Sequence, residues 1–162
     1  MQYAPQEKRH MADLIRNLET YKSLIREIPE SASLSTLADG LFIEINEYLP
    51  DLLGYSREQI VGHTSSEISI WTDPKDRVRF KEGLLGSPHG RECFEFTFRR
   101  GSGEIISCLL SARIVTISAE QYILAMLRDI FSFRKTMQEL EDSRERFRVL
   151  HEASFGGITI HD

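Results

Sequence analysis

The sequence predicts an α+β fold in which one five-stranded antiparallel sheet carries short helices on one face and an amphipathic helix stands at each end of the chain. Two short β-type runs, at residues 32–37 and 40–45, precede a region rich in helix caps, and three longer strand-like runs follow it. Apolar residues at alternating spacings of three and four recur near both ends. This order is typical of helices packed on an antiparallel sheet.

The first predicted helix covers residues 7–28 and ends before Pro29, whose ring and missing N–H disfavour helix continuation. Its apolar residues form a narrow stripe, and such a helix is marginal alone in water. We therefore interpret residues 1–29 as a dimerisation helix, although its own domain or the C-terminal helix could also be the partner. The residues of this predicted seam are Met11, Leu14, Leu18, Tyr21, Ile25 and Ile28.

Turn and cap residues define the next elements. Residues 38–40, Ala-Asp-Gly, are a hairpin signal between the two short strands. Asn46 is the expected N-cap of a short helix, and Gly54 is expected to end that helix in a left-handed conformation.

Two capping boxes come next along the chain. Ser56 with Gln59, and Thr64 with Glu67, place a hydroxyl three residues before a side chain that can reach back, so each predicts a short helix. A longer helix is expected to start at Asp73, with Pro74 at its first position, and to run to the Gly-Ser-Pro sequence at residues 86–88.

Three sequential strands are expected at residues 92–99, 104–117 and 122–130. The first alternates phenylalanines with other residues, so one of its faces is aromatic. Cys93 and Cys108 then point to opposite faces of the sheet, which argues against a disulfide between them.

A second amphipathic helix is expected at residues 132–152, directly after the last strand, with no Gly or Pro between them. Asp129 can cap the first free N–H groups of this helix. Arg144 occupies one position of the helix's apolar stripe. The other residues of the predicted seam are Phe133, Met137, Leu140 and Phe147.

Four stretches, at residues 43–62, 70–80, 94–112 and 122–130, resemble a PAS domain, the sensory module of bacterial signalling proteins, in their order and spacing. The resemblance covers residues 30–131. It implies a five-stranded sheet with a cavity between the inner face of the sheet and the short helices.

The last of these stretches is like the closing Asp-Ile-Thr motif of PAS domains, with Phe131 where Thr is usual. Pro50, inside the first short helix, departs from the family pattern. The resemblance implies that Arg128, Asp129 and Ile130 relay movement of the sheet to the linker helix at residues 132–152.

The C-terminal residues 153–162 resemble the start of a second PAS domain, which would make this chain a fragment of a longer protein. The sequence there echoes the start of the first domain. Phe147, Leu150, Ile158 and Ile160 stand where Tyr21, Leu24, Ala32 and Leu34 stand.

A candidate ligand cavity follows from the resemblance and from strand parity. Rows of aromatic and aliphatic residues at every second position are more often ordinary core, and no Arg or His cluster marks this cavity as a carboxylate site. The candidate lining residues are Trp71, Phe80, Phe94, Phe96, Cys108, Leu110 and Met126.

The cofactors of PAS relatives can be compared with the residues present. A flavin photoadduct needs a cysteine on the third short helix, and residues 64–70 contain none, which excludes that chemistry. The longer helix has no histidine for a haem axial ligand; His89 lies just beyond its end. Non-covalent flavin and a small organic ligand both remain open.

Composition narrows the function class. The net charge of −5 with scattered basic residues argues against nucleic-acid binding, and no apolar run approaches the length of a membrane span. Two cysteines without metal-ligand spacing are typical of a reducing compartment, so we expect a cytoplasmic protein with no metal site. No combination of residues predicts a catalytic site in this chain.

The sequence leaves two functions open. The first is a sensory PAS module that forms a homodimer through its flanking helices. It would relay a ligand- or partner-induced change to an output domain in the same chain, such as a histidine kinase of a two-component system or a diguanylate cyclase. The second is a passive spacer or protein-interaction domain with a collapsed core and no ligand.

Overall fold

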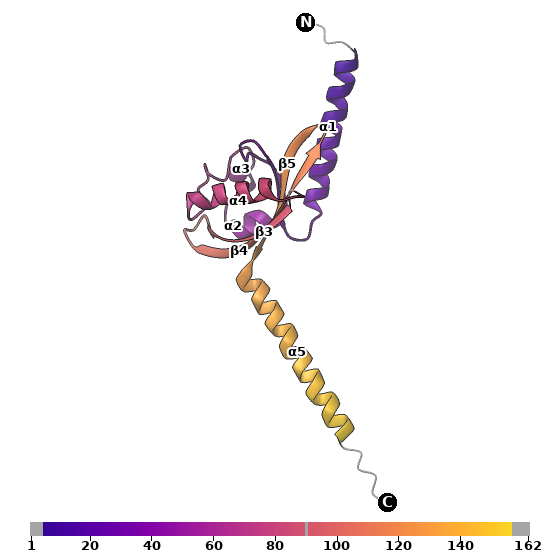
Figure 1. The fold of residues 1–162 in the computed structure, drawn as a ribbon, viewed down its shortest axis with the longest axis vertical. Helices are drawn as coiled ribbons and strands as arrows, with labels where there is room; N and C mark the ends of the chain where they lie inside the picture. Colours follow the sequence, from indigo (N-terminus) through magenta and orange to yellow (C-terminus); the bar gives the residue numbers. More distant parts are fainter. Residues whose placement is uncertain (1–4, 90, 157–162) are drawn as a thin grey trace, which may run out of the picture. The chain divides into compact units, whose positions relative to one another are not determined.

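The computed structural model describes residues 5–89 and 91–156, and the chain separates after Asp129 into two compact units (Figure 1). The first unit contains the sheet and the first four helices. The second contains the helix α5 (Ile130–Gly156).

A five-stranded antiparallel sheet forms the centre of the first unit, as predicted. The strand order is β2-β1-β5-β4-β3, so the first and last strands of the chain lie side by side in the middle of the sheet. Every paired strand in it is antiparallel. The strands are β1 (Ser31–Thr36), β2 (Phe42–Ile45), β3 (Arg91–Arg99), β4 (Ile105–Ile117) and β5 (Glu120–Asp129).

Three helices connect β2 to β3, namely α2 (Tyr48–Leu53), α3 (Arg57–Ile60) and α4 (Pro74–Gly86). Several predicted ends are confirmed. Gly54 ends α2 with a φ of 70°, where a side chain would be strained. The Ser56–Gln59 capping box opens α3.

The N-terminus of α4 also agrees with the prediction. The Asp73 carboxylate accepts a hydrogen bond from the Lys75 N–H, and Pro74 occupies the first turn of the helix.

The second predicted capping box forms without a helix. The Thr64 N–H donates to Glu67 at 2.6 Å and the Glu67 N–H donates to the Thr64 hydroxyl at 3.2 Å, yet residues 65–69 are turns. Ser69 adopts a φ of 55°, which stops helix growth. The segment lies between two isolated β-bridges, one made by Thr64 and one by Trp71.

Asn46 is not the N-cap of α2, contrary to the prediction. Glu47 occupies that position and makes no side-chain cap. The buried Asn46 amide instead accepts from the Ala32 N–H at 3.1 Å and donates to the carbonyls of Ile28 and Glu30. The backbone groups that Asn46 contacts need a hydrogen-bond partner from the protein, whereas the exposed N–H groups at the start of α2 can bond to water.

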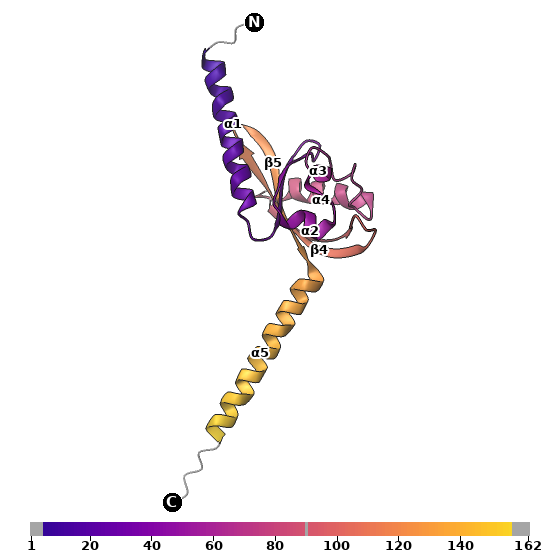
Figure 2. The same ribbon diagram turned by 180° about the vertical axis from the view of Figure 1, so that it is seen from behind.

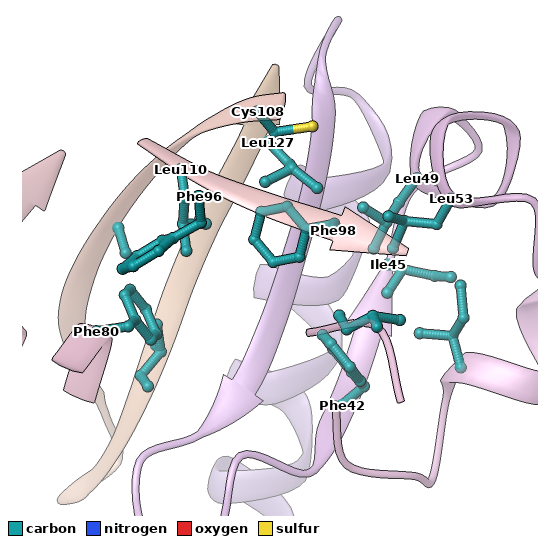
Figure 3. Close-up of a cluster of buried hydrophobic side chains, with 14 of the residues drawn as sticks. Phe42, Ile45, Leu49, Leu53, Phe80, Phe96, Phe98, Cys108, Leu110 and Leu127 are labelled. Carbon is teal, nitrogen blue, oxygen red and sulfur yellow. The ribbon is translucent and has the colours of Figure 1, made fainter. Parts of the chain in front are cut away.

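The hydrophobic core lies on the inner face of the sheet, and α2, α3 and α4 all contribute side chains to it. Figure 3 shows part of this cluster. The phenylalanines of β3 point into it, as their alternation predicts. Antiparallel register places residues of neighbouring strands opposite one another on the same face, so Cys108 and Leu110 of β4 join them.

Helix α1 (Pro5–Arg26) covers part of the opposite face of the sheet (Figure 1 and Figure 2). Ile25 is buried there with Ala32, Leu34 and Ile117, and Leu18 is packed against the same cluster. For this helix, its own domain was one of the partners that the narrow apolar stripe left open. It belongs to the first unit because the outer face of β1 is apolar.

Candidate functional site

The predicted cavity is mostly filled by aromatic rings. The Trp71 ring centroid lies 5.9 Å from that of Phe80 and 5.3 Å from that of Phe96, and Phe94 stacks on Phe96 at 5.4 Å. These rings come from α4, β3 and the segment before α4, and they contact one another directly. Rings at these distances stabilise a core by mutual packing.

A small pocket of about 50 Å³ remains between the sheet and α4. Liquid water occupies about 30 Å³ per molecule, so this volume suits one or two waters or a group of similar size. Trp71 and Phe80 are the predicted cavity residues that line it. Its other walls are Ser35, Leu37, Gly40, Ser65, Arg77, Lys81 and Ile123.

The remaining predicted lining residues do not line this pocket. Phe94, Phe96, Cys108 and Leu110 contribute to the packed core. The prediction for Met126 is wrong: it stands opposite Ser111 and Ala32 on the outer face of the sheet and is 36% exposed. Leu127 occupies the inward position. The residues of β5 that face inward are therefore offset by one from those that were predicted.

Two cations at the pocket were missed by the sequence analysis. Arg77 donates to the carbonyl of Asp39 at 2.6 Å, and Lys81 donates to the carbonyl of Ala38 at 2.8 Å. Both side chains therefore reach from α4 to the turn between β1 and β2. The spacing of Arg77 and Lys81 from the buried Phe80 and Leu84 puts all four on one side of the helix, and this signal could have revealed them.

The two cysteines lie on opposite faces, as expected. Cys93 is exposed, with its sulfur 3.5 Å from the Ser111 hydroxyl, and Cys108 is fully buried. Burial and the nearby Asp129 carboxylate raise the pKa of the Cys108 thiol to about 12, so this thiol stays protonated at neutral pH. A protonated, buried thiol is a core group rather than a nucleophile.

The predicted relay residues lie at the end of β5. Arg128 forms an ion pair with Glu30 in the connection between α1 and β1, so the beginning and the end of the domain are joined there. Asp129 stands opposite Cys108 in the sheet. Its proposed capping of α5 stays a prediction.

A buried carboxylate ties α1 to the domain. Glu44 of β2 is 1% exposed and accepts hydrogen bonds from Arg57, from Arg26 at 2.8 Å and from the Ile45 N–H at 3.0 Å. Burial acts to raise the pKa of Glu44, but the hydrogen bonds from the two arginines and the N–H outweigh it and hold the pKa below its ordinary value. Glu44 and its two arginine partners thus link α1, β2 and α3.

The two predicted seams have different environments. Leu18 and Ile25 of α1, and Ile28 just after its end, pack toward the sheet. Met11 and Tyr21 are exposed and Leu14 is half-buried. In α5 every residue from 131 to 154 is exposed. These residues include the whole predicted seam, namely Phe133, Met137, Leu140 and Phe147.

Helix α5 also extends past its predicted end. Residues 153–156, expected to open a second PAS domain, are helical. Ile158 and Ile160, which support that expectation, lie outside the described residues. Among the residues that the structure describes, no helix is long and apolar enough to cross a membrane, and no group of three metal-ligating side chains occurs.

Residues 29–131 match the PAS domain family, and the chain belongs to that family. The fold agrees with solved PAS domains. One is the PAS domain of an HTR-like protein from Haloarcula marismortui, with a TM-score of 0.56 and 23% sequence identity over 75% of this chain and 98% of that chain.

Two signalling proteins are similar in sequence. The chain is 27% identical to a probable diguanylate cyclase, DgcE, of Escherichia coli over 75% of its own length and 11% of that protein. It is also 27% identical to sporulation kinase A of Bacillus subtilis over 88% of its own length and 23% of that kinase. The chain thus spans well under a third of either relative.

Proposed function

We propose that this chain is a sensory and dimerisation module of a larger signalling protein, and that it passes a conformational change through α5 to an output domain. The observation that carries this proposal is the direct succession of β5 and α5. The strand ends at Asp129, the helix begins at Ile130, and an exposed apolar stripe follows along the helix. A loop at that point would absorb movement of the strand, whereas a continuous joint transmits it.

The relay requires two arrangements of sheet and helix and an input that binds them unequally. Moving such an equilibrium from 1:99 to 99:1 takes about 5.5 kcal/mol of differential binding. The Arg128–Glu30 ion pair supports this mechanism because it couples the end of β5 to the α1–β1 connection.

The volume of the pocket limits the input. Sites for drug-sized ligands occupy roughly 300–1,000 Å³, and the pocket beneath α4 measures about 50 Å³. In this conformation it is too small for a flavin or a haem. The input is therefore a very small molecule or a contact with another protein or domain.

The output is a histidine kinase or a diguanylate cyclase in the same cytoplasmic protein. Support comes from the two relatives, one named as a probable diguanylate cyclase and the other as a kinase. Because the chain spans only a small part of each, the output domain would lie outside these 162 residues.

Sedimentation equilibrium tests the proposed dimer. Leu140→Asp places a charge in the seam and should shift the chain from dimer to monomer. Val149→Asp is the matched control, because Val149 is an exposed apolar residue of α5 off the stripe, and it should leave association unchanged. Equal association of all three proteins would contradict the seam.

Asp129→Ala tests the relay in the full-length protein. It should abolish the response of the output activity to its signal. Ser56→Ala is a control that removes a helix cap elsewhere, worth about 1 kcal/mol of stability. A normal response in Asp129→Ala would leave Asp129 as a structural residue.

The passive spacer is a second candidate, favoured by the direct ring contacts that fill most of the predicted cavity. Native mass spectrometry with an absorption spectrum of the freshly purified protein separates the two. A stoichiometric bound molecule supports sensing, whereas an unliganded protein whose output ignores added ligands supports the spacer.

A further inference from the structure

Both apolar and polar side chains line the pocket beneath α4. Trp71, Phe80 and Ile123 supply rings and a branched side chain, and Ser35 and Ser65 supply hydroxyls. The Trp71 indole N–H donates to the Ser65 hydroxyl at 2.8 Å, which fixes the ring as one wall. A methyl-sized group with a polar head matches this mixed lining.

The lining also includes two positively charged side chains of α4, Arg77 and Lys81. Arg77 and Lys81 donate to carbonyl oxygens of the β1–β2 turn, which are neutral acceptors. These bonds already have charged donors, and a carboxylate in place of a carbonyl would add the attraction between opposite charges. An anion that reaches both cations would therefore compete well with the turn carbonyls.

The β1–β2 turn has a glycine where the Arg77 side chain lies against it. Gly40 has a φ of +74°, and a Cβ atom there would lie 2.9 Å from an Arg77 guanidinium nitrogen. The absence of a side chain thus lets Arg77 lie against the turn. The charge of Asp39, in the same turn, interacts with that of Arg77. The Asp39 carboxylate accepts hydrogen bonds from the Thr36 hydroxyl and the Leu41 N–H. The bond from Thr36 contributes most to lowering the pKa of Asp39.

We infer that this pocket binds a short-chain carboxylate of about two carbons. Its methyl end would enter the volume of about 50 Å³ between Trp71, Phe80 and Ile123. Its carboxylate would take hydrogen bonds from Arg77 and Lys81 in place of the turn carbonyls. Binding would release the β1–β2 turn from α4. This inference deepens the proposed sensory function, on which it rests, by naming the chemistry of the input.

Trp71 is the single tryptophan of the chain, so its fluorescence reports on the pocket directly. Sodium acetate should give a saturable emission change that sodium chloride at equal ionic strength does not. Acetamide, which has the same shape without the charge, should bind at least tenfold more weakly. Equal binding of acetamide, or no saturable change with acetate, would overturn the inference.

Variants locate the charge requirement. Lys81→Gln and Arg77→Gln should each weaken acetate binding about tenfold or more, while Arg77→Lys should retain most of it. Lys75→Gln removes the same charge from an exposed position of α4 and should bind as the unmodified chain does. Unchanged acetate binding in both Lys81→Gln and Arg77→Gln would refute the site.

The comparison of acetate with acetamide needs no variant, so it decides the question even if a substitution prevents folding. Loss of acetate binding leaves the α5 seam and its Leu140→Asp test unaffected. Conversely, a monomeric protein that binds acetate would refute the dimer and retain the pocket.

Discussion

The two long helices α1 and α5 share the same alternating spacing of apolar residues and meet different surroundings. The C-terminal half of α1 packs on the outer face of the sheet, where Ile25 is 4% exposed. Along α5 the corresponding stripe is open, and Leu140 is 55% exposed. A narrow stripe of apolar residues therefore predicts that a helix packs against a partner, but it does not predict which partner.

The largest expected effect separates the two faces of α1. Ile25→Ala removes buried methylene and methyl groups and should lower the free energy of unfolding by about 3 kcal/mol. Leu24→Ala, at the adjacent and largely exposed position, should change it by less than about 0.5 kcal/mol. Urea unfolding followed by Trp71 fluorescence measures both. Equal effects would mean that α1 does not pack on the sheet in solution.

The ionic tie between α1 and the domain should have the next largest effect. Glu44→Gln removes the acceptor of Arg26 and Arg57 and should cost about 2 kcal/mol, less than for a wholly buried pair because both arginines are partly exposed.

The same substitution has a defined pH dependence. Because folding lowers the pKa of Glu44 below its ordinary 4.5, its contribution is present above that pH and is lost as the pH falls through the folded value. The difference in stability between the two proteins should therefore shrink below about pH 4.5. A difference that stays constant down to pH 3 would contradict the assigned role.

An exposed seam residue should act on association and not on folding. Phe147→Ala in α5 should leave the unfolding of the first unit within about 0.5 kcal/mol of the unmodified chain. It should weaken self-association about tenfold, which corresponds to about 1.4 kcal/mol. Sedimentation and urea unfolding on the same samples separate the two effects. A destabilised first unit would show that α1 and α5 differ less than proposed.

The smallest effect concerns the exposed contact between α1 and the β4–β5 turn. Asn17 donates a hydrogen bond to the Ser118 hydroxyl at 3.2 Å. Asn17→Ala should cost less than about 0.5 kcal/mol, because water replaces an exposed partner readily. Hydrogen exchange at the turn is the sensitive measurement. A larger loss would mean that this contact, rather than Ile25, positions α1.

Local sequence signals predicted most of the fold. Phenylalanine alternation in β3 placed its core face correctly, and Gly54, Ser56 and Asp73 marked helix ends, because caps and parity depend on neighbouring residues only. The helix expected after Thr64 and the capping role expected of Asn46 were wrong for the opposite reason. β-Bridges hold Thr64 and Trp71 at either end of the first segment, and Asn46 bonds to the α1–β1 connection. Local patterns do not encode either contact.

At the candidate site, too, local signals predicted some residues correctly, and contacts between distant residues were missed. Trp71 and Phe80 were expected at the cavity, but Met126 was assigned to the wrong face, since a one-residue error in parity reverses a strand. Arg77 and Lys81 were missed because their acceptors are backbone carbonyls of the β1–β2 turn, 38 and 43 residues away in the chain.

The antiparallel five-stranded sheet and the two amphipathic helices could be predicted from the sequence, because both depend on periodicity and on short-range capping. The family was predicted from the resemblance of residues 30–131 to PAS domains. The tertiary structure alone decided which stripe is covered, how little of the cavity stays open and which cations reach it. These depend on the packing of side chains that are distant in the chain, and close packing leaves room for a pocket only where the shapes of several elements fail to fill the space.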